Sequence, residues 1–215
     1  MSENWAKPER AVLADVLDGA GPDAPTLCEG WQTRDLAAHL VVRERRPDAS
    51  IGLVFKPLAG HTARVTESTA GIPYDDLVQK FRSGPGRLSP FALPGVDAAA
   101  NTVEFFVHTE DVRRATPGWS PRNLEPGLDD ALWSRLRSQS KLTFRNATMP
   151  LKLVRTGADG ATVDEYVVRA GDDPVVVTGQ AGELVLHAFG RKECRVTVTG
   201  PDDAVQAYLG ESRKV

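Results

Sequence analysis

The sequence predicts an α+β protein in which a helical N-terminal part is followed by a small α+β module. Apolar residues recur with helical spacing through the first two-thirds of the chain, beginning with the segment Ala6–Leu17. After Asn146 the pattern changes to short runs rich in β-branched residues, which are typical of strands. A chain of 215 residues is long enough for two domains with proper cores. We therefore predict a helical domain at residues 1–147 and an α+β domain at residues 148–215.

The expected helices of the first domain are bounded by capping residues and by glycine or proline. They are Ala6–Leu17, Thr33–Arg46, Tyr74–Phe81, Asp97–Ala115 and Leu128–Phe144. Thr33 and Asp97 are the predicted N-caps of their helices. The segment Asp48–Pro73, rich in Gly, Thr, Ala and Pro, predicts a long loop with a short helix.

The second domain is expected to alternate strands and helices. The predicted strands are Leu151–Arg155, Thr162–Val168, Val175–Thr178 and Arg195–Thr199, and the predicted helices are Gln180–Phe189 and a last one that starts at Pro201. The turn sequence at residues 157–160 predicts a hairpin between the first two strands.

Composition excludes several function classes. A net charge of −3 provides no basic field for nucleic acid or for an anionic membrane. No apolar run approaches the ~20 residues that span a bilayer, and the first residues lack the pattern of a signal peptide. The two cysteines, Cys28 and Cys194, lie far apart and make no disulfide framework. We expect a reduced, cytoplasmic protein.

Two predicted helices direct metal-ligand side chains toward the core. Glu104 and His108 are four residues apart, so they lie one turn from each other in the middle of an apolar helical face. His39 lies between Leu36 and Leu40 on another helix, again on the core side. A lone histidine in such a position is most often a core residue, and an unpaired charge there is costly. The three residues together indicate a divalent cation.

Two histidines and a carboxylate are the ligand set that catalytic zinc uses with water in its fourth position, and other divalent metals also accept it. Asp111 is placed to accept the other ring N–H of His108, and Asn101 to bond Glu104. Helix-end solubility is an equal alternative for both residues. His61 and Cys28 have ordinary explanations, an exposed loop residue and a buried thiol. His187 is predicted to be structural.

Several motifs resemble the DinB-like metal-binding superfamily, in the branch of mycothiol-dependent maleylpyruvate isomerase. They are Cys28–Trp31, Asp35–Leu40, Glu104-x-x-x-His108-x-x-Asp111, Gly179–Leu186, Gly190–Arg191 and Val196–Gly200. The resemblance extends over nearly the whole chain. It implies a four-helix bundle that binds metal, followed by a sterol-carrier-like domain.

The resemblance also implies a chemistry. His39, Glu104 and His108 would bind a divalent metal, usually zinc, and the metal would activate the thiol of mycothiol. In the isomerase this thiol adds to a conjugated diacid, the double bond rotates, and the thiol leaves. Arg191 is the counterpart of a catalytic arginine, and Arg43, one turn after His39, is a second cation for carboxylates of cofactor or substrate. A surface role for Arg43 and a turn-capping role for Arg191 remain open.

The leading hypothesis is a metalloenzyme that uses a small-molecule thiol and a small anionic substrate, in isomerase or transferase chemistry. One alternative is a hydrolase in which the metal activates water. Another is a non-catalytic protein that binds metal or a small ligand, and a third is a descendant that has lost its metal. In the last case His39 would not approach Glu104 and His108.

Overall fold

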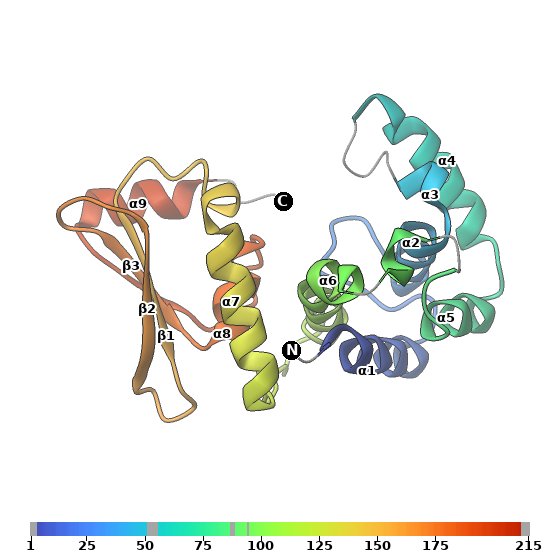
Figure 1. Cartoon of the computed structure of the whole chain (residues 1–215), viewed down its shortest axis with the longest axis horizontal. Helices are drawn as coiled ribbons and strands as arrows, with labels where there is room; N and C mark the ends of the chain where they lie inside the picture. The colour runs from blue at the N-terminus through green and yellow to red at the C-terminus, as the bar shows by residue number, and fades with distance from the viewer. Residues whose placement is uncertain (1–3, 51–55, 87–88, 94, 212–215) are drawn as a thin grey trace. The chain divides into compact units, whose positions relative to one another are not determined.

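The computed structural model describes residues 4–50, 56–86, 89–93 and 95–211 (Figure 1). The chain divides into two compact units, which we call unit 1 (Met1–Trp119) and unit 2 (Ser120–Val215). Helices occur together with one four-stranded sheet, so the predicted α+β class is confirmed. Among the described residues, no helix combines the length and the apolar character needed to cross a membrane.

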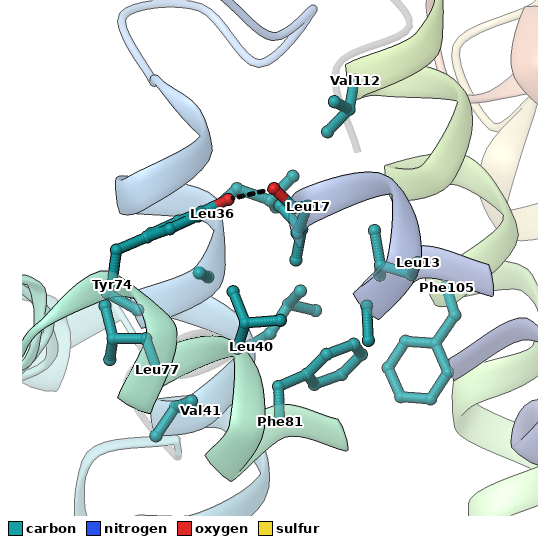
Figure 2. Close-up of a cluster of buried hydrophobic side chains, with 14 of the residues drawn as sticks. Leu13, Leu17, Leu36, Leu40, Val41, Tyr74, Leu77, Phe81, Phe105 and Val112 are labelled. Carbon is teal, nitrogen blue, oxygen red and sulfur yellow. Dashed lines mark hydrogen bonds between the residues drawn. The ribbon is translucent and has the colours of Figure 1, made fainter. Parts of the chain in front are cut away.

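Unit 1 is built from helices. In chain order they are α1 (Ala6–Ala20), α2 (Thr33–Arg45), α3 (Pro47–Ser50), the 3-10 turn η2 (Lys56–Leu58), α4 (Ala59–Ala70), α5 (Tyr74–Arg82), the 3-10 turn η3 (Pro90–Ala92) and α6 (Val96–Arg113). Helices α1, α2, α5 and α6 contribute side chains to one apolar core (Figure 2). The core residues that Figure 2 labels are Leu13, Leu17, Leu36, Leu40, Val41, Tyr74, Leu77, Phe81, Phe105 and Val112. This core fixes α2 and α6, which carry the predicted metal ligands.

The predicted helices of unit 1 are present, but the residues that cap α2 and α6 are not the predicted ones. Helix α2 is capped by Gln32, whose backbone N–H donates to Asp35 Oδ2 at 2.9 Å in a reciprocal capping box. Thr33, the predicted cap, instead donates its hydroxyl to the carbonyl of Gly21. Helix α6 follows Gly95 at φ 79°, and Asp97 lies in its first turn.

The segment 48–73 contains more helix than the composition predicted. Helix α4 occupies twelve of its residues, between η2 and the turn before α5. Residues 51–55 of this segment lie outside the described residues.

The described part of unit 2 combines the sheet with three helices. Its elements are α7 (Pro126–Thr143), β1 (Leu151–Thr156), β2 (Thr162–Arg169), β3 (Val175–Gly179), α8 (Ala181–Ala188), β4 (Thr197–Thr199) and α9 (Asp202–Gly210). The strand order is β2-β1-β3-β4. Strands β1 and β2 form the predicted antiparallel hairpin, β1 and β3 are parallel, and β3 and β4 are antiparallel. Helix α7 packs against α8 and β2 (Figure 1).

The division between the units differs from the predicted boundary at 147/148. It lies at Trp119/Ser120, so α7 belongs with the sheet rather than with the N-terminal helices. The side chains of α7 explain the difference. Trp133 donates its indole N–H to Asp164 Oδ2 on β2 at 2.8 Å, and Arg155 on β1 pairs with Asp129 at 2.7 Å. Helical periodicity identified α7 but contained no information about its partners.

Candidate metal centre

The structure brings together the three predicted metal ligands. Oε1 of Glu104 on α6 lies 3.6 Å from Nε2 of His39 on α2 and 3.3 Å from Nε2 of His108, one turn further along α6. One donor atom from each of the three residues lies within 4.8 Å of the others. The sequence prediction that His39 approaches Glu104 and His108 is therefore confirmed. Their role as metal ligands stays a prediction.

This geometry fits a small divalent cation. In a tetrahedral site with bonds of about 2.1 Å, ligand atoms are separated by about 3.4 Å, close to the two distances from Glu104 Oε1. Two imidazole nitrogens and one carboxylate oxygen suit zinc and several other first-row metals. The side chains of His39 and Glu104 are 14% and 24% exposed, so the cluster is accessible to a small ligand. Three protein donors leave a position for that ligand.

The ionisation of the cluster is strongly coupled. Burial alone would raise the pKa of Glu104, but the contacts with His108 and His39 outweigh it and hold the pKa well below its usual value. Burial lowers the pKa of His39, and Glu104 offsets this only in part. Burial also acts to lower the pKa of His108, yet Asp111, Cys28 and Glu104 together raise it well above its usual value. A metal would therefore displace a proton from His108, because imidazole binds metal in its neutral form.

The predicted partner of His108 is present. Oδ2 of Asp111 lies 3.0 Å from Nδ1 of His108, and the Asp111 side chain is fully buried. The same Oδ2 accepts a hydrogen bond from Sγ of Cys28 at 3.2 Å. A carboxylate bonded to Nδ1 leaves Nε2 to face the other two ligands.

The predicted contact between Asn101 and Glu104 is wrong. The Asn101 side chain instead donates from Nδ2 to Glu44 at 3.1 Å and to Asp97 at 2.7 Å. Its Oδ1 accepts from Arg43. The spacing of three residues between Asn101 and Glu104 allowed the predicted contact, but the carboxylates of Glu44 and Asp97 bind the amide instead.

Arg43 is close to the cluster, as its position one turn after His39 predicted. Its Nε lies 3.3 Å from Oε1 of Glu104, the oxygen that both histidines face. The guanidinium also donates to Asn101 and lies over the ring of Phe91, 4.7 Å from its centroid. Arg43 thus supplies positive charge to the site, and its proposed binding of a cofactor stays a prediction.

The remaining candidates lie in other surroundings. Arg191, in unit 2, donates to the carbonyl of Phe189 at the end of α8 at 2.9 Å, a contact typical of a turn-capping arginine. The side chain of His61, on α4, is 41% exposed, and its Nε2 lies 3.4 Å from Oδ2 of Asp48. His187 is buried and contacts the hydroxyl of Tyr208 at 2.9 Å. The catalytic role predicted for Arg191 stays a prediction.

Sequence reasoning assigned no role to two features beside the centre. The ring of Trp31 packs on that of His39, with centroids 5.1 Å apart. A buried network joins Arg10 of α1 to Glu44 of α2 and Asp97 of α6. The packing of Trp31 on His39 could have been anticipated, because Trp31 belongs to the Cys28–Trp31 motif. Long-range pairing of buried charges leaves no local pattern that would identify the second.

Comparison with known proteins found one family model that matches part of the chain. Residues 8–51 match the family model of the mycothiol maleylpyruvate isomerase N-terminal domain, and this segment includes His39, Arg43 and Cys28–Trp31. No curated protein matches the sequence.

Two solved structures of the mycothiol-dependent maleylpyruvate isomerase are similar to most of the chain. A histidine-to-alanine variant has a TM-score of 0.58 at 16% identity, and a second structure has a TM-score of 0.54 at 17% identity. Each match covers 91% of this chain and 90% of the other. The resemblance inferred from the sequence is therefore confirmed, since residues 8–51 have the pattern of the mycothiol maleylpyruvate isomerase N-terminal domain and the chain shares the fold of the isomerase structures.

Proposed function

We propose that this protein is a metal-dependent enzyme that uses a small-molecule thiol, with a chemistry like that of the mycothiol-dependent maleylpyruvate isomerase. The observation that supports this most is the convergence of His39, Glu104 and His108 on one small volume. The segment that matches the family model includes the first of these residues. The fold shared with the isomerase structures adds the second support.

In this proposal His39, Glu104 and His108 hold a divalent cation, for which zinc is our first candidate. When bound, the cation acts as a Lewis acid that stabilises a thiolate or a hydroxide in the remaining position. Asp111 holds the proton on Nδ1 of His108, which directs Nε2 to the site. Arg43 partly neutralises Glu104 and provides a cation near the position where an anionic substrate would bind.

The decisive experiment measures metal and thiol binding separately. Metal analysis of the purified protein should find about one equivalent of divalent metal for each chain, the amount that the site of His39, Glu104 and His108 would hold. Calorimetric titration with mycothiol should then give heat with the zinc-loaded protein and little with the metal-free protein. Zinc-loaded protein supplied with mycothiol should also isomerise maleylpyruvate or a related conjugated diacid.

The alternatives predict different results. If metal is present but mycothiol binds equally with and without it, a hydrolase with metal-activated water is the better assignment. If metal and a small ligand bind and no reaction is catalysed, the protein is a binding protein. Absence of metal from the protein, even after incubation with zinc, would contradict the proposed centre itself.

A further inference from the structure

The loop Thr26–Trp31 connects α1 to α2 and has a tightly bonded backbone. An isolated bridge between Pro25 and Gln32 closes its base. Inside the loop, the hydroxyl of Thr26 donates to the carbonyl of Trp31 at 2.8 Å, and the backbone N–H of Trp31 donates to the backbone carbonyl of Cys28 at 3.0 Å. Gly30 has a φ of 78°, a conformation that favours glycine. These contacts hold Cys28 and Trp31 at fixed positions within the loop.

One part of the loop binds Asp111, the residue whose carboxylate contacts His108. The N–H of Leu27 donates to the backbone carbonyl of Asp111 at 3.0 Å, and Sγ of Cys28 donates to its Oδ2 at 3.2 Å. The same Oδ2 lies 3.0 Å from Nδ1 of His108. The thiol and the imidazole therefore share one carboxylate oxygen, and the loop restricts the rotation of that carboxylate.

The other end of the loop packs on His39. The Trp31 ring is tilted by 50° against the imidazole at a centroid distance of 5.1 Å. Trp31 is half-buried and also packs against the apolar core of unit 1. A large ring held in this way restricts the rotation of the His39 side chain about its own bonds.

We infer that the loop Thr26–Trp31 orients both histidines of the metal centre. Cys28 acts on His108 through Asp111 and through its own contact with Nδ1, at 3.8 Å from Sγ, and Trp31 acts on His39 directly. This inference rests on the proposed metal centre and assigns a function to the Cys28–Trp31 motif. Cys28 and Trp31 are positioning residues. Groups that orient metal-bound histidines set the affinity of a site, because a misaligned imidazole must be reordered before it binds.

The test compares zinc affinity among matched variants. Cys28→Ala should weaken zinc binding by about tenfold, the lower end of the range for partners of metal ligands. Cys28→Ser, which keeps a donor to Asp111, should restore most of this loss. Cys194→Ala is the control, because Cys194 is also half-buried but lies in unit 2, and this variant should leave the zinc affinity unchanged. Trp31→Leu should weaken zinc binding and Trp31→Phe should largely retain it.

A second readout is independent of zinc. Nitrogen-detected NMR of the histidine rings in the metal-free protein reports the hydrogen bonding of the His108 ring nitrogens and the exchange of its Nδ1 proton. In Cys28→Ala this proton should exchange faster and its signal should shift, while both stay unchanged in Cys194→Ala. A purely structural effect of Cys28 would lower the free energy of unfolding and leave the ring signals of the folded protein as they are.

The two readouts separate the inference from the proposed function. Failure of the wild-type protein to bind zinc would contradict the metal centre, and the ring signals would still decide whether the loop orients the histidines. Wild-type zinc affinity in both Cys28→Ala and Trp31→Leu, or unchanged ring signals in Cys28→Ala, would overturn the inference.

Discussion

Nε of Arg43 lies 3.3 Å from Oε1 of Glu104, the oxygen toward which both histidines of the candidate centre direct Nε2. An arginine and a metal ion are both cations, so they would share this carboxylate when a metal is bound. Arg43 is therefore expected to act in two ways. It neutralises Glu104 in the metal-free protein, and it opposes the binding of a second positive charge.

This relationship predicts the effect of Arg43→Met. Loss of the guanidinium removes one of the cations beside Glu104, so the metal-free protein should lose about 1.5–3 kcal/mol of its free energy of unfolding. The zinc-loaded protein should lose less, because the metal supplies the missing charge. By linkage, the variant should bind zinc more tightly than the wild type. Urea denaturation with chelator and with zinc measures both losses, and equal losses would show that Arg43 and the metal do not share Glu104.

His108→Ala should abolish stoichiometric metal binding. Two remaining ligands rarely hold a divalent ion against solvent, and metal affinity falls sharply with each ligand that is lost. His61→Ala is the matched control, since the side chain of His61 on α4 is 41% exposed and pairs with Asp48, away from the three candidate ligands. Elemental analysis after dialysis measures the result. A full equivalent of zinc in the His108→Ala variant would show that the ligand assignment is wrong. Addition of zinc should raise the melting temperature of the control and not that of His108→Ala.

The helices that present the ligands are joined by a buried ion network. Arg10 binds Glu44 through both Nη atoms, with one distance of 2.7 Å, and reaches Asp97 at 3.2 Å. Glu44 is only 1% exposed. Its burial raises the pKa of the Glu44 carboxyl, and the bonds from Arg10 oppose this rise. Removal of Arg10 would leave a carboxylate in the interior without its principal cation.

Arg10→Met should therefore lower the free energy of unfolding by about 3–5 kcal/mol, the cost of breaking a buried ion pair. Arg82→Met is the control, because Arg82 pairs with Asp15 and Asp18 at the surface and should lose only about 0–1 kcal/mol. Chemical denaturation of both variants gives the comparison. Addition of Glu44→Gln to Arg10→Met should recover part of the loss, since it removes the unpaired charge. Similar losses for Arg10→Met and Arg82→Met would contradict the role given to the network.

Helical periodicity explains why the sequence located the candidate site. Glu104 and His108 share a face because they are four residues apart, and Asp111 follows at the spacing that reaches His108. The apolar neighbours of His39 placed it on the core side of its helix. These arguments use only local geometry, so they were sufficient for residues on α2 and α6.

The features that the sequence did not reveal depend on contacts between distant segments. Asn101 has the spacing to reach Glu104, but it binds Glu44, which lies 57 residues away in the sequence. Trp133 assigns α7 to the sheet through Asp164, 31 residues further along the chain. Pairing of this kind depends on tertiary packing, which periodicity does not encode. The same holds for Arg10, whose burial is visible only after α1 has docked on α6.

The burial of Tyr74 in the core of unit 1 predicts how the stability of the protein changes at alkaline pH. Its hydroxyl donates to the carbonyl of Leu17 at 2.8 Å (Figure 2), and the residue is only 7% exposed. Burial raises the pKa of Tyr74 to about 12, an effect that a contact with Thr33 and the charge of Arg34 oppose only in part. In the unfolded chain the phenol should ionise near its usual pKa of about 10.

The sign of the pH effect follows from these two values. Below pH 10 the phenol keeps its proton in both states, so its contribution to stability is complete. Between pH 10 and pH 12 the unfolded chain releases the proton first, so the free energy of unfolding should fall by at most about 1.4 kcal/mol for each pH unit. Other groups titrate in this range, and Tyr74→Phe isolates the contribution of Tyr74. The stability difference between wild type and variant should be constant up to pH 10 and should decrease above it.

The ultraviolet absorbance of tyrosinate provides a direct check, since the chain has only three tyrosines. Tyr74→Phe should remove one phenol that titrates near pH 12 from the folded protein. The loss of the bond to Leu17 should cost about 0.5–1.5 kcal/mol at neutral pH, because the Leu17 carbonyl still accepts from the N–H of Gly21 at 3.1 Å. Removal of a phenol that titrates near pH 10, or a stability difference that stays constant up to pH 12, would show that the interior does not hold the Tyr74 proton.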